Sequence, residues 1–310
     1  MSQAFVLRWH TRDVLLLLVL LASPLFFIGG PDWLAPPVIR ELWSQGHWLF
    51  FACLFFWWQA RWTLTHPRQW LLATLAVLLV SALIEGAQTL VGRQAGWNDV
   101  LCNVTGTWLG LFWGQRAERR VWLGRVIAVG LVLWQVKVVL AVGLAQWHQQ
   151  HQFPVLGDFE SRWDMPFWEG RVERVPAPVA EGRYSLAFEV GGDNTASRYS
   201  GVHLKQLPGD WRGYQALALS LYNPVESPLA MTLRINDTQH DRGEGAFSDR
   251  YNGRLQLEPG WNHYRIDLQT VEQAPEQRDM NLASVERLLL FATDIEQSRW
   301  LYLDNLRLER

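Results

Sequence analysis

Apolar residues are spread unevenly along the chain, densely up to about residue 147 and at ordinary frequency after it. The dense half contains five long apolar runs, at 14–28, 47–62, 70–88, 99–114 and 126–145. A helix needs about 20 apolar residues to cross a bilayer, so the shorter runs must recruit flanking residues or thin the bilayer. We therefore predict a five-helix transmembrane domain over residues 1–146. A cleaved signal peptide is the alternative for the first run, because Arg8 and Arg12 precede it.

The second half has a different pattern. After a polar segment at 147–156, predicted to be a linker, short runs with period-two alternation are separated by turn residues. These runs are RYSLAFEVG, YSGVHLKQL, YQALALSLYN, LAMTLRIND, GRLQLEP, WNHYRIDL, VERLLLFATD and RWLYLDNLRL. Regular short runs of this kind, without a helical run, favour an antiparallel sandwich. We predict an all-β jelly-roll domain over residues 157–310.

Basic residues predict the orientation of the helices. The N-terminal tail and the second and fourth loops contain eight arginines, and the first and third loops contain two. The eight are Arg8, Arg12, Arg61, Arg68, Arg116, Arg119, Arg120 and Arg125. Cytoplasmic loops carry the excess of basic residues, so we expect a cytoplasmic N-terminus, a multi-pass protein of the plasma membrane and an extracytoplasmic C-terminal domain.

Polar residues interrupt two of the apolar runs near one short loop. Glu85 and Gln88 end the third run, and Asp99 and Asn103 lie one helical turn apart in the fourth, with Arg93 in the loop between them. Charged groups at a membrane boundary are costly and usually have a partner and a role. We predict a polar site there, on the outer face.

These residues resemble the pattern of the VanZ-like membrane proteins. The pattern has a histidine opening one helix, Glu-x-x-Gln closing the next, then Arg, Asp and Asn-x-x-Gly. The matching residues here are His47, Glu85, Gln88, Arg93, Asp99, Asn103 and Gly106. Trp43 stands where the family usually has an aspartate, with Glu41 as the nearest acid. The resemblance, over residues 10 to 120, implies a bacterial cell-envelope protein and traits such as resistance to teicoplanin-type glycopeptides.

Other interpretations of these polar residues remain open. Each one alone fits a helix cap, an ion pair or interhelical hydrogen bonding. As a group they also fit an enzyme acting on a polyprenyl phosphate or lipid-linked sugar, with His47, Glu85 and Asp99 as acid–base groups. A sensor or assembly factor is a third class. Lys137, inside the fifth run, has either Glu85 as a partner or a snorkelling or cavity-facing side chain.

The β-rich half carries candidate ligand residues. Asp237, His240, Asp249 and Arg250 follow one predicted strand closely enough to recognise hydroxyls or an acidic sugar. The alternative is an Asp–Arg pair that merely fixes the loop. Trp211, Trp261 and Trp300 are either stacking platforms or core residues. Asp158 and Asp304, near the two ends of the domain, are too few to predict calcium.

The opening DFE with Trp163 and the closing LYLDNLRL resemble the galactose-binding-like, carbohydrate-binding-module class. With a net charge of -2 and no basic patch, the chain has no footprint for nucleic acid. It has no phosphate loop, nucleophile motif or metal-ligand cluster, and we expect no cofactor and no metal. The sequence thus predicts a membrane protein that interacts with lipid and with an envelope glycan or lipid-linked glycan; a protein partner is not indicated.

Overall fold

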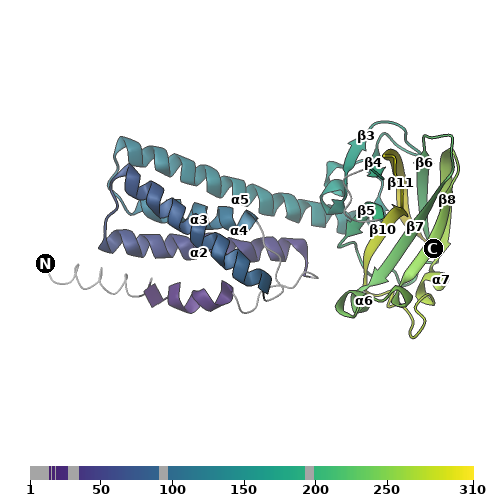
Figure 1. Ribbon diagram of the computed structural model, residues 1–310, viewed down its shortest axis with the longest axis horizontal. Helices are drawn as coiled ribbons and strands as arrows, with labels where there is room; N and C mark the ends of the chain where they lie inside the picture. Colours follow the sequence, from purple (N-terminus) through teal and green to yellow (C-terminus); the bar gives the residue numbers. More distant parts are fainter. Residues whose placement is uncertain (1–13, 15, 18, 27–34, 91–96, 193–198) are drawn as a thin grey trace. The chain divides into compact units, whose positions relative to one another are not determined.

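The computed structural model describes the chain except residues 1–13, 15, 18, 27–34, 91–96 and 193–198, and except the side chains of 25, 26 and 88–90. The chain forms two compact units, Met1–Val142 and Gly143–Arg310. The first unit is helical and the second is built mainly of strands (Figure 1). The predicted order, a helical region followed by a β-sandwich, is confirmed.

Four long helices come after a first helical stretch, whose described residues are 14, 16, 17 and 19–22. They are α2 (Pro37–Arg61), α3 (Pro67–Leu90), α4 (Trp97–Trp113) and α5 (Arg119–Gln152), after a short 3-10 helix at Ser23–Phe26. Proline occupies the first turn of α2 and α3, where its missing N–H group is not needed. Phe51 and Phe55 of α2, Leu111 and Phe112 of α4 and Val121 of α5 are buried together and form the core of the unit.

Glycines hold α2 and α4 close together. A Cβ atom added to Gly106 would overlap the backbone carbonyl of Trp48, and one added to Gly110 would lie 2.5 Å from the Cβ atom of Phe55. Only glycine permits this separation, so Gly106 and Gly110, spaced as G-x-x-x-G, serve helix packing.

The prediction of five membrane-spanning helices needs correction. Among the described residues, only Pro67–Ala87 of α3 and Arg119–Gln152 of α5 are long and apolar enough to cross a membrane. The helix α4 has 17 residues, and α2 contains several polar side chains between its apolar ones. The sequence prediction treated every apolar run as a span. It did not reject runs that are too short or that contain polar residues. The first run, 14–28, lies partly outside the described residues.

The predicted linker, residues 147–156, is helical over its first six residues. The helix α5 continues to Gln152, and the first strand begins at Val155. Nε2 of His148 lies 3.0 Å from Oδ1 of Asp164, and Nε2 of Gln152 donates to the same oxygen at 2.8 Å. Because these polar side chains bind a buried carboxylate of the second unit, the end of α5 stays helical and belongs to that unit.

Two antiparallel sheets face each other in the second unit (Figure 1). The six-stranded sheet has the order β3-β4-β11-β6-β9, with β1 paired to β11. Its strands are β1 (Val155–Gly157), β3 (Val172–Val175), β4 (Ser185–Val190), β6 (Ala216–Asn223), β9 (Gly260–Asp267) and β11 (Arg299–Glu309). The five-stranded sheet has the order β2-β5-β10-β7-β8. Its strands are β2 (Trp168–Glu169), β5 (Tyr199–Lys205), β7 (Leu229–Asp237), β8 (Tyr251–Leu257) and β10 (Val285–Thr293).

All eight strand-like runs of the sequence form strands, which are β4 to β11. The three strands that the sequence did not predict, β1 to β3, have two to four residues each, too few to show a period. Two short helices, α6 (Thr238–Arg242) and α7 (Leu268–Glu272), were also missed, because each fills one turn after a strand. Asp237 and Asp267 cap them through their side chains.

Alternate residues of each strand form the core between the sheets. Leu288 and Leu290 of β10, Leu233 of β7 and Leu301 of β11 are fully buried there, whereas their sequence neighbours face outward. Trp211 is also fully buried and donates from Nε1 to the carbonyl of Pro208, so it is a core residue. The outward residues of the two sheets are the positions free to bind a ligand.

Candidate functional site

The helical unit brings several of the predicted polar residues together. Nδ1 of His47 lies 3.1 Å from Oδ1 of Asn103, and Nε2 of His47 lies 3.7 Å from Oδ2 of Asp99. Nδ2 of Asn103 donates to Oγ of Ser81 at 2.8 Å. His47 and Asn103 are 5% and 1% exposed, so this is a buried polar network between α2, α3 and α4. Ser81 was not predicted, because a lone serine in an apolar run carries no distinctive signal.

The remaining predicted residues of this group are Glu85, Gln88 and Arg93. Glu85 is buried on α3. The side chain of Gln88, and all of Arg93, lie outside the described residues. On α5, the ammonium group of Lys137 stacks over the ring of Trp134 at 4.9 Å. The roles assigned to Glu85, Gln88 and Arg93 stay predictions.

In the sandwich, Asp237, His240 and Asp249 come together around a residue that the sequence did not indicate, Arg278. The Nη1 and Nη2 atoms of Arg278 bind the two carboxylate oxygens of Asp237 at 2.6 and 2.8 Å. Its Nε atom binds Oδ1 of Asp249 at 2.6 Å. The Nδ1 atom of His240 donates to the carbonyl of Asp249 at 3.0 Å. Each predicted group in this cluster, which we name the Arg278 network, is thus engaged within the protein.

The fourth predicted residue, Arg250, leaves that cluster. Its guanidinium lies over the ring of Phe247 at 5.3 Å, and Nε binds Oδ1 of Asn252 at 3.2 Å. Asp249 and Arg250 are adjacent in sequence but their side chains diverge. Arg250 instead lines a pocket on the outer face of the five-stranded sheet.

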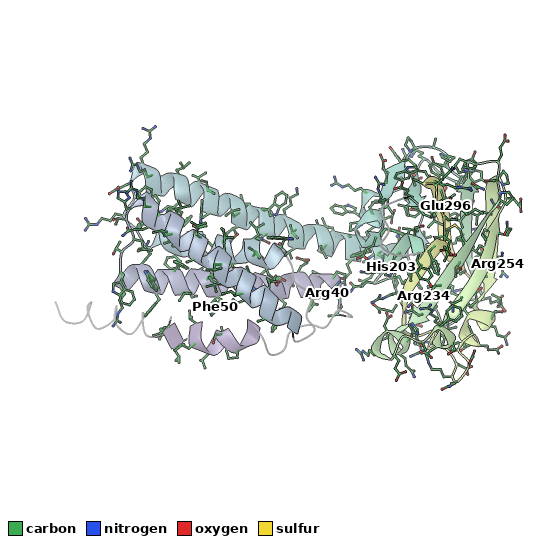
Figure 2. All side chains as sticks on the ribbon, viewed as in Figure 1. Arg40, Phe50, His203, Arg234, Arg254 and Glu296 are labelled. Carbon is green, nitrogen blue, oxygen red and sulfur yellow. The ribbon has the colours of Figure 1, made fainter. Side chains whose placement is uncertain are left out.

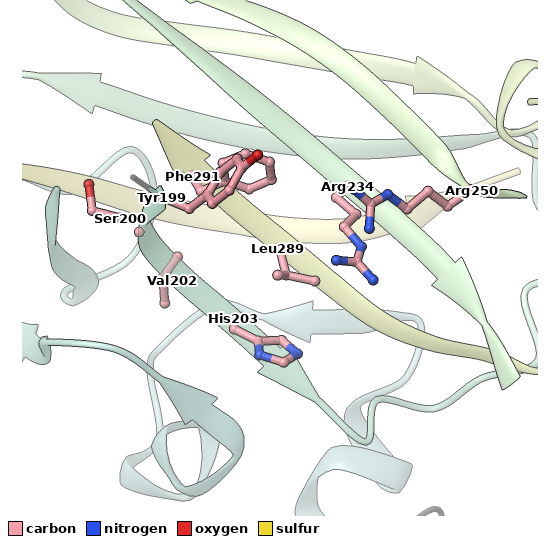
Figure 3. A pocket seen from close by; sticks show the side chains of 9 residues that line it. Tyr199, Ser200, Val202, His203, Arg234, Arg250, Leu289 and Phe291 are labelled. Carbon is pink, nitrogen blue, oxygen red and sulfur yellow. The ribbon is translucent and has the colours of Figure 1, made fainter. Parts of the chain in front are cut away.

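The pocket, about 460 Å³ in volume, lies over β5, β10 and β7 (Figure 3). In β-sheet register, His203 of β5 lies beside Leu289 of β10, and Leu289 lies beside Arg234 of β7. The next row places Gly201 beside Phe291. Because the three strands are hydrogen-bonded to one another, the outward side chains have fixed spacing, and Leu289 forms an apolar floor between two polar walls.

An aromatic pair closes one end of the pocket. The rings of Tyr199 and Phe291 are 5.4 Å apart and nearly perpendicular, and the side chain of Tyr199 is well exposed. Gly201 beside Phe291 has no side chain, and a Cβ atom there would overlap the backbone of β10. The glycine therefore lets β5 approach β10 and leaves the edge of the Phe291 ring uncovered.

Two guanidinium groups occupy the other end (Figure 3). Nε of Arg234 binds Oδ1 of Asn236 at 3.0 Å, and its Nη2 atom donates to Nε2 of His240 at 3.1 Å. His240 thus links Arg234 to the Arg278 network and holds its guanidinium in place. Burial and the neighbouring charge of Arg250 lower the pKa of Arg234 to about 10, and burial also lowers the pKa of Arg250.

His203 forms the side wall of the pocket. Its Nε2 atom is buried and has no hydrogen-bond partner within the described part of the chain. Burial, together with the charges of Lys205, Arg287 and Arg234, lowers the pKa of His203 to about 3. At neutral pH the ring is therefore uncharged, and Nε2 is available either to donate or to accept a hydrogen bond.

The residues that line this pocket have no distinctive pattern in the sequence. Tyr199, His203, Arg234 and Phe291 occupy outward positions of alternating strands, where polar and aromatic residues are common. Trp261 and Trp300 face outward on the other sheet, where Trp261 packs against Tyr222 at 5.2 Å. Asp304 is buried and accepts from the backbone N–H groups of residues 180, 181 and 305. The described residues contain no cluster of three or more His, Cys, Asp or Glu placed to hold a metal ion.

No family model matches the chain, and no curated protein matches it. The resemblance to VanZ-like proteins therefore has its motif residues alone as support. Among solved structures, the chain is similar to the family 11 carbohydrate-binding module from Clostridium thermocellum in complex with a β-1,3-1,4-mixed-linked tetrasaccharide. That likeness has 14% identity and a TM-score of 0.37, and it covers 50% of this chain and 94% of the module.

Two further structures show the same degree of likeness. A carbohydrate-binding module specific for non-crystalline cellulose has 14% identity and a TM-score of 0.34, over 51% of this chain and 93% of that one. An exo-β-agarase has 13% identity and a TM-score of 0.38, over 50% of this chain and 24% of the agarase.

Proposed function

We propose that the sandwich binds a glycan in the pocket over β5, β10 and β7, and that the helical unit anchors the sandwich to the bacterial plasma membrane. The observation that carries the proposal is the composition of the pocket. An aromatic pair, the exposed Tyr199 and the half-buried Phe291, stands at one end, and the charged donors of Arg234 and Arg250 stand at the other.

Sugar rings suit such a surface because they have two kinds of edge. Their C–H faces are apolar and pack against aromatic rings, and their hydroxyls need hydrogen-bond partners once water is removed. Here the ring-sized apolar floor of Leu289 lies between the donors and the aromatic pair. A pocket with an apolar floor and a few convergent polar groups is the usual form of a small-ligand site.

The pocket is also held rigid before any ligand arrives. Leu289 and Phe291 stand on the central strand of the five-stranded sheet, and His240 and Asn236 fix the guanidinium of Arg234. A binding site built on strands loses little conformational entropy when it is occupied. This favours recognition over a mechanism that requires closure of a lid.

Membrane anchoring is supported by the surfaces of α3 and α5. Only 17% of the apolar window in α3 and 11% of that in α5 is buried, whereas the core helix of a soluble protein is mostly buried. Leu72 and Leu79 of α3 and Leu133 of α5 are each more than 60% exposed. Such apolar faces fit a lipid environment. The arginine distribution favours a cytoplasmic N-terminus and an extracytoplasmic sandwich, which requires an odd number of crossings, so this topology needs at least one spanning helix besides α3 and α5.

The network around His47 carries a second candidate function, the VanZ-like site on a lipid-linked glycan. It is favoured by one feature: Nε2 of His47 faces Asp99, whose side chain is 17% exposed, while Nδ1 is held by Asn103. A histidine held through Nδ1 can exchange a proton through Nε2 with Asp99, whose partly exposed carboxylate would be the group that meets a substrate. Resistance to teicoplanin-type glycopeptides is the trait that the resemblance implies.

Glycan binding is tested on the full-length protein in lipid nanodiscs, against an array of neutral and acidic envelope and plant polysaccharide fragments. Tyr199→Ala and Phe291→Ala should each weaken binding at least ten-fold. Trp300→Ala removes an exposed aromatic residue of the opposite sheet and should change little. If none of the glycans binds, or if the three variants behave alike, the pocket is not a glycan site.

Topology is tested by reporters fused after Arg310. Alkaline phosphatase should be active there, and a fluorescent protein that matures only in the cytoplasm should be dark. The opposite result would place the sandwich in the cytoplasm and would remove the envelope glycan as its ligand.

A further inference from the structure

The outer face of the five-stranded sheet carries four cations close to the pocket, and they differ in their partners. Lys205 and Arg287 lie just outside the pocket, and each forms an ion pair with a carboxylate. Nζ of Lys205 lies 2.5 Å from Oε1 of Glu169, and Nε of Arg287 lies 2.8 Å from Oδ2 of Asp241. Lys205 and Arg287 are therefore neutralised by acids of the protein itself.

Arg234 and Arg250 line the pocket, and within the described part of the chain neither makes an ion pair; the carboxylate of Asp241, which pairs with Arg287, offsets the charge of Arg234 only from a greater distance. Their hydrogen bonds go to the amide oxygens of Asn236 and Asn252 and to the ring of His240, all of them uncharged acceptors. Within the described part of the chain, no carboxylate lies within ion-pair distance of either guanidinium, and none lines the pocket. The Nη1 atom of Arg234 and both terminal nitrogens of Arg250 keep donors for a ligand.

This arrangement is unfavourable while the pocket is empty. Two partly buried like charges repel each other, and burial removes part of their hydration. The lowered pKa values of Arg234 and Arg250 report the same penalty. An anion between the two guanidinium groups would relieve it, because charge-assisted hydrogen bonds from arginine to an oxyanion are among the strongest in proteins.

His203, labelled together with Arg234 in Figure 2, adds an uncharged donor on the other side of Leu289 from Arg234 (Figure 3). Neighbouring strands of a sheet lie about 4.8 Å apart. The backbones of His203 and Arg234, with β10 between them, are therefore about 10 Å apart. Its buried Nε2 atom lacks a partner among the described residues. A ligand lying over Leu289 would reach Nε2 on one side and the guanidinium groups on the other.

We propose that the pocket is specific for an acidic glycan, in which a sugar-borne oxyanion, a carboxylate or a phosphate, binds Arg234 and Arg250 while the sugar ring lies over Leu289 toward Phe291. The proposal rests on the glycan-binding function inferred above and names the chemical class of the ligand. The aromatic pair supplies affinity for the ring, and the two guanidinium groups select the charge.

The test uses full-length protein in nanodiscs of zwitterionic lipid and matched pairs of glycans. Each acidic oligosaccharide is compared with its carboxyl-reduced or dephosphorylated counterpart, so that only the charge differs. The acidic member should bind about ten-fold more tightly at 50 mM salt, and the ratio should fall as salt increases. The carboxylated and phosphorylated pairs show which oxyanion is preferred.

Matched variants locate the effect. Arg234→Gln and Arg250→Gln should each abolish most of the preference for the acidic member. Arg254→Gln removes the same charge from the neighbouring strand β8, outside the pocket, where Arg254 is exposed beside Thr232, and should leave the preference within about two-fold of the wild type. An equal loss in all three variants would indicate unspecific attraction and overturn the proposal.

Different results would overturn acidic specificity and glycan binding. Equal binding of acidic and neutral members, or a preference for the neutral ones, would overturn acidic specificity and leave glycan binding intact. Absence of binding to every member of every pair would overturn the glycan-binding function itself and, with it, the specificity.

Discussion

Replacing Arg278 by methionine should strongly destabilise the sandwich. Arg278 makes a two-pronged contact with Asp237, which is fully buried, and a further contact with Asp249. Methionine keeps much of the side-chain volume but removes the charge. The variant therefore leaves a buried carboxylate without its counter-ion, at the end of β7 where α6 begins.

The size of the effect follows from what Asp237 retains. Breaking a buried ion pair by removing one partner costs about 3–5 kcal/mol. Asp237 still accepts from the backbone N–H groups of His240, at 2.9 Å, and Asn281, at 2.8 Å. These bonds stabilise the anion, so we expect a loss near the lower end, about 3 kcal/mol in the free energy of unfolding.

The pH dependence of the loss has a definite sign. Burial by itself raises the pKa of Asp237, but the hydrogen bonds from Arg278, Asn281 and His240 outweigh it and hold the pKa below its usual range. In the wild type this carboxylate stabilises the fold above about pH 4 and loses that contribution as the pH falls further. Without Arg278, burial should dominate and raise the pKa. The deficit of the variant should therefore be largest at pH 7 and smaller at pH 4.

Native-state hydrogen exchange in the full-length protein measures the effect without isolating the sandwich. The slowest amides of β7 and β10 report its opening free energy. Arg212→Met is the control, because Arg212 makes a comparable two-pronged contact with Asp210 but both side chains are more than half exposed. It should change the opening free energy far less than Arg278→Met does, because solvent screens an exposed ion pair. A loss below 1 kcal/mol for Arg278→Met, or a deficit that grows toward pH 4, would refute the reasoning.

Three further outcomes follow from other contacts. The pKa of His203 is about 3 in the fold and about 6.5 in the unfolded chain, so the free energy of unfolding of the sandwich should fall by about 2 kcal/mol between pH 8 and pH 5. His203→Gln should remove that part of the pH dependence, as measured by hydrogen exchange. Gly110→Leu should lower the stability of the helical unit in detergent by about 1–3 kcal/mol, whereas Gly130→Leu, where an added Cβ meets nothing within 4 Å, should not. In a deletion strain under glycopeptide stress, His47→Ala at normal expression should fail to restore growth, whereas His66→Ala, at an exposed position, should restore it.

Local pattern was sufficient to predict the strands but not the pocket that they form. Period-two alternation marked His203, Arg234 and Leu289 as lying on three strands, and it indicated which side chains face outward. Their neighbourhood depends on the order β5-β10-β7, in which strands distant in sequence pair with one another. Nothing within a single strand encodes that order, so the row of three residues could not be predicted.

The loop residues show the same limit at shorter range. Asp237 and His240 were correctly seen as close, because one helical turn separates them. Arg278, which binds both acids, comes from a loop 41 residues after Asp237. Arg250 was grouped with Asp249 because the two are adjacent, yet Arg250 lies at the start of a strand and lines the pocket instead.

In the helical half, apolar composition predicted helices well but overestimated how many can cross a membrane. The buried contact between His47 and Asn103 joins α2 to α4, and Gln59 of α2 donates to the carbonyl of Leu111 on α4. Polar groups of this kind bind the helices to one another. They also shorten the uninterrupted apolar length, which a count of apolar runs does not register.

The measurement that tests the central claim most directly is hydrogen exchange of the full-length protein with and without a saturating acidic oligosaccharide. The account predicts protection at residues 199–203 of β5, 289–291 of β10 and around Arg234 and Arg250, with exchange on the outer face of the six-stranded sheet unchanged. Protection confined to the six-stranded sheet or to the Arg278 network, or none at saturation, would contradict it.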